Sequence, residues 1–299
     1  MNIREPDWSL YRSFLAVLQE GSLSGAARTL GLTQPTLARH VETLERAVGF
    51  ELFTRSPQGL AATEAALELK PYAESLAATA AALLRSASGQ GHSVKGTVRV
   101  RASEIVGAEV LPAIFADLAE RHPELEIELV LSNAVENLLR RDADVAVRMV
   151  APAQEALVTQ HVGSVTLGLH AHRRYLERHG VPRSLKGLRD HRIIGVDRET
   201  PVVRALFERV PGLTAVKACF RTDSDIAHLM AIKAGLGIGI CQVALARRDR
   251  ELRRVLATAF DLKLGVWIAM HENLRSTPRC RIVFDALVDG LHKVKEVFS

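Results

Sequence analysis

Residues Ser22 to Glu45 combine helix-capping positions with side chains that can bind nucleic acid. The segment reads SLSGAARTLGLTQPTLARHVETLE. Its Gln, Arg and His side chains carry donors and acceptors that suit base edges or phosphates. Gly31 separates two short runs with helical spacing, which predicts two helices joined by a tight turn. The segment therefore predicts a helix-turn-helix, and an ordinary αα-hairpin inside a helical core is the alternative.

The second of these helices should have one buried face and one polar face. Leu37, Val41 and Leu44 recur at helical spacing on the buried face. Hydroxyls at the starts of the helices can accept first-turn amides, and the polar face would enter a major groove. The candidate DNA-binding residues, including one arginine on a following hairpin, are Ser22, Ser24, Thr33, Gln34, Pro35, Thr36, Arg39, His40 and Arg55.

Two flanking segments should support this motif. An apolar helical face over residues 8–20 predicts a first helix that packs behind it. After Gly49, two short strands around the turn at residues 56–59 predict a wing. Arg55 would then lie near a phosphate or the minor groove, and the alternative is an exposed arginine that only aids solubility.

A long helix rich in Ala and Leu is predicted over residues 63–87. Leu69, Leu76 and Leu83 repeat every seven residues and alternate with alanines, a pattern typical of a coiled-coil seam. We expect this helix to pair with a second copy of the chain, and packing against its own domain is the alternative. The Ser- and Gly-rich residues that follow should form a hinge.

From Thr97 onward, strands and helices alternate in a pattern typical of an α/β fold. The order strand, helix, strand, helix, strand over residues 97–149 predicts parallel strands. A second block begins near Val165. A strand over residues 263–270 and a helix over residues 278–297 should return to the first lobe. Ligands of such sheets bind at the carboxyl ends of the strands.

Polar residues at these strand ends are the candidate ligand site. Ser103 follows the first strand and precedes a helix, where free amides could bind an anion. Arg148 closes the third strand and could hold a carboxylate with two hydrogen bonds or pair with Glu104. For every candidate other than Glu104 and Arg148, the alternative is an ordinary N-cap or loop residue. The expected ligand is a small organic acid or an amino acid. The candidate set is Ser103, Glu104, Ser132, Asn133, Arg148, Thr222, Asp223 and Ser224.

The positive charge of the chain lies away from the candidate DNA-binding residues. The chain has 39 Lys and Arg against 34 Asp and Glu, but residues 1–90 have eight against nine. Global charge therefore does not support DNA binding. That function must depend on the local placement of Arg39, His40 and Arg55, and on two copies per site.

Several classes of protein are disfavoured. Cys219, Cys241 and Cys280 form no CxxC motif, which favours buried structural thiols over a disulfide scaffold or zinc knuckle and leaves a redox sensor as the minor alternative. The chain shows no signal-peptide h-region and no apolar run that could span a bilayer, so we expect a cytoplasmic protein. Nucleophile-elbow, zinc-protease and phosphate-loop motifs do not occur, so we expect no enzyme, metal or cofactor.

Five blocks of the sequence share the register of one known family. They are AARTLGLTQPTLARHVETLERAVGFELFTR at 26–55, TEAA at 63–66, GTVRV at 96–100, DADVAVRM at 142–149 and AIKAGLGIGI at 231–240. With these blocks the chain resembles the LysR-type transcriptional regulators over essentially its whole length. The resemblance implies a winged helix-turn-helix, a dimerising linker helix and a two-lobed effector domain like the periplasmic binding proteins.

The resemblance also implies partners and residue roles. The partners would be double-stranded DNA, a small-molecule effector, a second copy in a homodimer or dimer of dimers, and RNA polymerase, with no membrane. Gln34, Pro35, Thr36 and Arg39 match the groove-facing positions. Arg39 could read a guanine and Gln34 an adenine or a phosphate, while Thr36 and His40 suit phosphates.

Three positions depart from the family pattern. Ala38 stands where a serine is common, which would remove one hydroxyl contact to the DNA backbone. Ala66 replaces a usual glycine and favours helix. Cys241 and Gln242 stand where a proline often follows the strand, so the shape of that loop is open.

The expected organisation has five segments. A small-molecule-binding protein and an architectural DNA binder without inducer response are the alternative functions. The expected segments are a winged helix-turn-helix at 1–62, a linker helix at 63–88, a hinge at 89–96, lobe I at 97–164 and 265–299, and lobe II at 165–264.

Overall fold

The computed structural model forms two compact units, which are described separately. The first comprises mainly residues 1–84, and the second comprises residues 85–139 and 143–299. The structure describes residues 5–56, 59–88, 94–133, 143–151, 157–197, 203 and 217–293.

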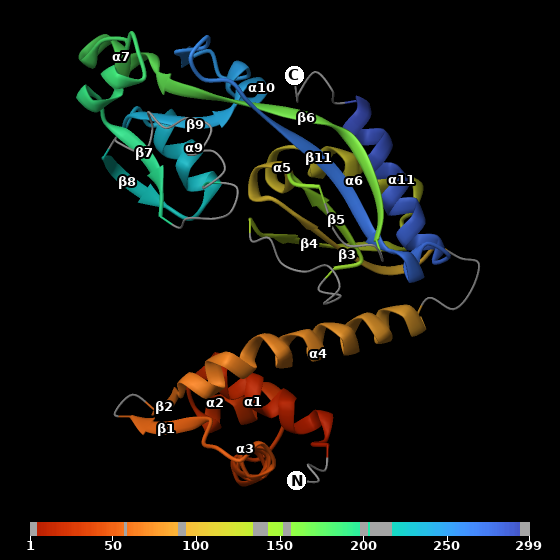
Figure 1. The fold of residues 1–299 in the computed structure, drawn as a ribbon. Helices are drawn as coiled ribbons and strands as arrows, with labels where there is room; N and C mark the ends of the chain where they lie inside the picture. The colour runs from red at the N-terminus through yellow and green to blue at the C-terminus, as the bar shows by residue number, and fades with distance from the viewer. Residues whose placement is uncertain are drawn as a thin grey trace. The chain divides into compact units, whose positions relative to one another are not determined.

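The first unit begins with three helices whose ends are fixed by local capping. The Ser22 hydroxyl accepts the Gly25 amide at 3.1 Å, and the Thr33 hydroxyl accepts the Thr36 amide at 3.3 Å. Gly31 ends the second helix in the left-handed region, with φ of 65°. These caps confirm the predicted helix-turn-helix (Figure 1). The helices are α1 (Trp8–Glu20), α2 (Leu23–Leu30) and α3 (Gln34–Val48).

A two-stranded wing follows, with β1 (Phe53–Ser56) antiparallel to β2 (Gly59–Ala62). Gly59 has φ of +126°, and a Cβ there would lie 2.6 Å from the Gly21 carbonyl oxygen. Only glycine fits this close approach without strain. The Leu60 amide donates to the same Gly21 oxygen at 2.8 Å, so the wing is anchored to the turn between α1 and α2.

Helix α4 (Glu64–Ser88) contributes to the core of its own unit. Ala66 and Ala73 are buried there, and Leu69 is partly buried against the same cluster. The first half of the predicted seam therefore packs inside its own domain, which corrects the expectation that the whole seam faces a second copy. Leu76 and Leu83 remain 47% and 64% exposed. Within the expected hinge, residues 89–93 lie outside the described part of the chain.

In the second unit, nine described strands form one sheet with the order β4-β3-β5-β11-β6-β9-β7-β8, and β10 pairs with β6. The strands β3, β4 and β5 are parallel, as predicted. The bounds are β3 (Gly96–Ala102), β4 (Leu125–Leu131), β5 (Val145–Arg148), β6 (Leu157–His172), β7 (Ile193–Val196), β8 (Ala218–Thr222), β9 (Ile238–Gln242), β10 (Leu252–Val255) and β11 (Leu262–His271).

Two long antiparallel strands, β6 and β11, pass through both lobes of this unit (Figure 1). The lobe boundaries expected at 164/165 and 264/265 fall inside these strands. β11 also pairs with β5 in lobe I, while β6 pairs with β9 and β10 in lobe II. The lobes therefore share continuous strands instead of meeting at a loop.

Each lobe has its own core. In lobe I, buried residues of β3, β5 and β11 pack against α6 and α11, so the last helix returns to lobe I as predicted. Lobe II holds two smaller clusters around Leu188 and Leu229. The predicted helix over residues 132–143 falls largely outside the described residues. The helices are α5 (Glu104–Glu109), α6 (Leu111–Arg121), α7 (Arg173–His179), η2 (Lys186–Asp190), α9 (Asp225–Lys233), α10 (Val243–Arg247), η4 (Glu272–Leu274) and α11 (Pro278–Lys293).

Candidate functional site

The solvent-facing surface of α3 presents the predicted polar residues. Gln34, Pro35 and Arg39 are exposed and Thr36 is partly exposed, as is Ser22 at the start of α2. The opposite face of α3 is fully packed, because its apolar residues are buried in the core of the unit. The helix therefore offers an exposed cation and an exposed amide on a rigid support, which is the chemistry that major-groove recognition needs.

Hydrogen bonds hold the first turn of α3 in place. The Ser24 hydroxyl of α2 donates to Gln34 Oε1 at 3.1 Å. The hydroxyl oxygens of Thr33 and Thr36 lie 2.8 Å apart and share a hydrogen bond. The predicted residues of α2 and α3 are thus linked to one another, which positions the Gln34 side chain before any ligand arrives.

His40 is only partly exposed and its Nδ1 is turned toward α1, which argues against the phosphate contact expected from the sequence. Its Nδ1 lies 2.8 Å from Oγ of Ser13, a residue only 1% exposed. A buried hydroxyl needs such a partner, because an unpaired one would cost free energy on burial. We conclude that His40 holds α3 against α1.

The wing is tied to α3 through Glu45. Its Oε1 accepts the Leu52 amide at 2.7 Å and the Phe53 amide at 3.3 Å. Arg55 is exposed on β1, opposite Leu60 of β2. Sequence reasoning missed Glu45; the available signal was an acid one turn before the helix-ending glycine and close to the next strand.

Four of the predicted ligand-site residues form one hydrogen-bonded group in the second unit. Glu104 Oε2 accepts the Ser224 hydroxyl at 2.8 Å and the Ile226 amide at 3.2 Å. The Glu104 amide donates to Asn133 Oδ1 at 3.2 Å. The Ser224 amide donates to Thr222 Oγ1 at 3.1 Å. The strand ends of the two lobes therefore converge here, as the sequence predicted.

The other predicted members have different roles. Ser132 accepts a hydrogen bond from Arg101 Nη2 at 2.8 Å. Ser103 precedes α5, but its hydroxyl makes no capping hydrogen bond. Arg148 ends β5, and Asp223 is an exposed residue after β8. The anion site expected at Ser103 would rest on a helix of six residues, which offers little for an anion to bind.

Asp225 was not predicted, although it follows the Ser224 N-cap directly. Its pKa is raised to about 6, first because protein atoms surround the carboxyl and then because the Glu104 charge lies nearby. A hydrogen bond with Asn133 opposes part of this rise. The side chain as a whole stays exposed, so solvent weakens the effect. Two carboxyl groups nevertheless share this end of α9.

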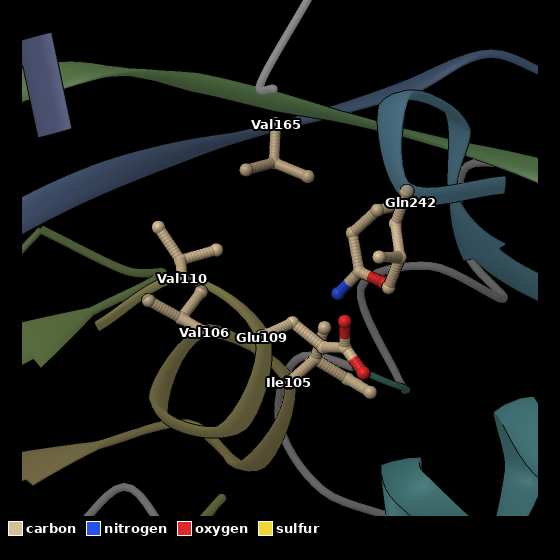
Figure 2. A pocket seen from close by; sticks show the side chains of 7 residues that line it. Ile105, Val106, Glu109, Val110, Val165 and Gln242 are labelled. Atoms are coloured by element: carbon tan, nitrogen blue, oxygen red, sulfur yellow. The ribbon is translucent and has the colours of Figure 1, made fainter. Parts of the chain in front are cut away.

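A small hollow lies beside this group, between α5 and the segment from β9 to α10. Its volume is about 10 Å³, room for about one water molecule. Figure 2 shows the side chains of Glu109 and Gln242 reaching toward each other among apolar neighbours. In this conformation the hollow is too small for an organic ligand. The lining residues are Ile105, Val106, Glu109, Val110, Val165, Gln242 and Leu245.

Buried titratable groups near the strands of lobe II are neutral and structural. Burial lowers the pKa of His228 to about 4, and its Nε2 accepts the Ile240 amide at 3.2 Å. Burial raises the pKa of Cys241 to about 12, and its sulfur lies 3.3 Å from Nδ1 of His170. The reactive thiolate of Cys241 is therefore disfavoured, which argues against a redox role for this cysteine.

Family models match both units of the chain. The model described as the LysR substrate binding domain covers residues 91–292. The model described as the bacterial regulatory helix-turn-helix protein of the lysR family covers residues 8–67. The chain belongs to the LysR family of bacterial transcriptional regulators. Family membership confirms the predicted fold class, with a helix-turn-helix part and a two-lobed effector-binding part.

Individual relatives of this LysR-family chain are also transcriptional regulators by name. An HTH-type transcriptional regulator of Xanthomonas campestris pv. campestris is 28% identical over 63% of this chain, and the match spans 55% of that relative's length. The probable HTH-type transcriptional regulator LtrA of Klebsiella pneumoniae is 25% identical over 81% of this chain and 78% of its own. The structure of full-length CbnR complexed with its target DNA is 19% identical, covers 96% of this chain and 99% of CbnR, and has a TM-score of 0.61.

None of the helices among the described residues of this LysR-family chain is long and apolar enough to cross a membrane.

Proposed function

We propose that this LysR-family chain acts in the cytoplasm, binds a promoter-proximal dyad site as a dimer or dimer of dimers, and changes its activity when a small molecule binds the second unit. The observation that carries the proposal is the exposed polar face of α3, with Gln34 and Arg39 on a packed and capped helix. That the structural neighbour CbnR has been solved in complex with target DNA supports DNA binding by this chain.

Arg39 is the proposed base-reading residue. Its guanidinium is exposed near the start of α3 and can donate two hydrogen bonds to O6 and N7 of a guanine. Such a pair is worth about 1–3 kcal/mol of discrimination against the wrong base. Gln34 would read an adenine or contact a phosphate, Thr36 would contact the DNA backbone, and Arg55 of the wing would contact a phosphate or the minor groove.

Helix α4 is the proposed dimer element. Tyr72, Leu76 and Leu83 fall on one side of this helix by its period, and each is strongly exposed. Burying one such leucine fully contributes about 1.5–3 kcal/mol. This apolar stripe lies beside the face on which Ala66 and Ala73 pack into the core. Helix α4 can therefore pack against its own core and against a second copy at the same time.

The proposed ligand is an amino acid, chosen from the two classes that the sequence predicts. Glu104 and Asp225 place two carboxyl groups at the convergence of the strand ends. A simple organic acid would be repelled by these charges, whereas the ammonium group of an amino acid can pair with them. The ligand response would then be transmitted to RNA polymerase at the promoter.

Footprinting across the source genome, with and without mixtures of amino acids or organic acids, tests this function. We expect protection of a dyad-symmetric site near the gene for this chain and a changed pattern with amino acids. Protection that ignores every metabolite would favour an architectural DNA binder. Metabolite binding without protection of DNA would favour a plain small-molecule-binding protein.

A further inference from the structure

The carboxylate of Glu104 joins the two lobes of the second unit. Glu104 begins α5 in lobe I, while Ser224 and Ile226 stand at the start of α9 in lobe II. One carboxylate oxygen accepts from the Ser224 hydroxyl at 2.8 Å and from the Ile226 amide at 3.2 Å. Both donors belong to the positive end of a nine-residue helix, where an anion is stabilised.

The next residue of α5 strengthens the same connection. Ile105 is only 5% exposed and packs in a cluster whose other buried members belong to lobe II, among them Leu229 and Ile232 of α9. Two consecutive residues of lobe I therefore make one polar and one apolar contact with lobe II. The small size of the neighbouring hollow agrees with lobes that are drawn together at this point.

We infer that Glu104 is a built-in anion that binds the start of α9 and holds the lobes together without a ligand, so that an effector acts by displacing it. That an effector displaces Glu104 rests on the proposed ligand response. That Glu104 joins the lobes rests on the contacts alone. A further consequence is that free anions have no access to the start of α9 in the wild-type chain.

Polar groups around Glu104 act on this contact in opposite directions. The Ser224 hydroxyl and the Ile226 amide stabilise its carboxylate, and Asn133 fixes its backbone amide. The Asp225 carboxyl on the same end of α9 opposes it by like charge. A ligand that brings a positive group to these carboxyls, and a negative group to α9, could replace Glu104 without leaving the helix end unpaired.

Hydrogen exchange on the full chain tests the inference. Glu104→Ala removes the carboxylate, and Glu104→Gln neutralises it while keeping its shape. Glu120→Ala and Glu120→Gln, at an exposed position of α6 in lobe I, are the matched controls. We expect amide exchange over residues 224–228 to speed up by about tenfold in Glu104→Ala, less in Glu104→Gln, and not in the controls.

Formate supplies a second and independent measurement. Added formate should slow the exchange over residues 224–228 in Glu104→Ala toward the wild-type rate, and should leave the wild type and Glu120→Ala unchanged. Wild-type exchange rates in both Glu104 variants would overturn the inference. Fast exchange that formate does not slow would also overturn it, because the carboxylate would then act only through packing. A failure of the proposed function would show differently, as absent operator protection by the wild-type chain.

Discussion

Glu45 of α3 and Leu52 before the wing are joined by a 2.7 Å hydrogen bond from the Leu52 amide to the Glu45 carboxylate. This contact fixes the wing relative to the helix that should read DNA. The two parts of the proposed DNA-binding surface are therefore joined by one part-buried polar contact within the first unit.

Glu45→Ala should lower both stability and operator affinity. The lost charge-assisted bond leaves the Leu52 and Phe53 amides without this partner, which costs about 1.5–3 kcal/mol of unfolding free energy. The wing would also move relative to α3. Denaturant unfolding and gel shifts measure the two effects, with the exposed Glu42→Ala as control. Equal behaviour of the two variants would show that Glu45 does not position the wing.

His40→Ala should lower stability without changing the salt dependence of DNA binding. The imidazole holds buried Ser13 and therefore stabilises the packing of α1 and α3 by about 1 kcal/mol. A phosphate contact would instead reduce the slope of log affinity against log salt by about one. Gel shifts over a salt series decide this point, and a reduced slope would restore His40 to the DNA-contacting set.

Leu76→Glu combined with Leu83→Glu should convert the proposed dimer into monomers. Both side chains are exposed on the same side of α4, where a charge cannot be buried against a second copy. Leu67→Glu, on the opposite side of the helix, is the matched control. Sedimentation velocity measures the oligomeric state of each variant. Dimers that survive the double substitution would exclude this stripe as the interface.

The buried His228 should make the second unit less stable as the pH falls. Its pKa is lowered to about 4, so in the unfolded chain it takes up a proton first, near pH 6.5. The contribution of neutral, buried His228 to the free energy of unfolding is complete above about pH 6.5 and is lost as the pH falls toward 4. Asp225, with its raised pKa, acts in the opposite direction. His228→Gln should therefore reduce the fall in unfolding free energy between about pH 6.5 and 4, when that free energy is measured as a function of pH. A slope equal to that of the wild type would contradict the lowered pKa of His228.

Sequence alone predicts those features that depend on neighbours within a turn or two. Ser22, Gly31 and Thr33 act within four residues of their partners, so the helix-turn-helix could be recognised directly. The alanines of α4 were ambiguous, because small residues suit a core and a coiled coil equally well. Ala66 and Ala73 serve the core of their own unit.

Long-range pairs were beyond such reasoning. Glu104 and Ser224 were both predicted as site residues, but nothing local showed that they bond to each other across 120 residues. His40 has a polar side chain at a position suited to DNA contact, and only the packing of α1 reveals its partner in Ser13. The unbroken strands β6 and β11 likewise depend on pairing partners far along the chain.

The central claim is that the exposed face of α3 reads DNA, and Arg39 tests it most directly. The measurement is a quantitative gel shift on the footprinted site with Arg39→Ala, beside Arg46→Ala as a control at the other end of the same helix. Sedimentation should show that both variants remain dimers. We predict that Arg39→Ala abolishes specific binding while Arg46→Ala retains most of it. Wild-type affinity in Arg39→Ala would contradict the account.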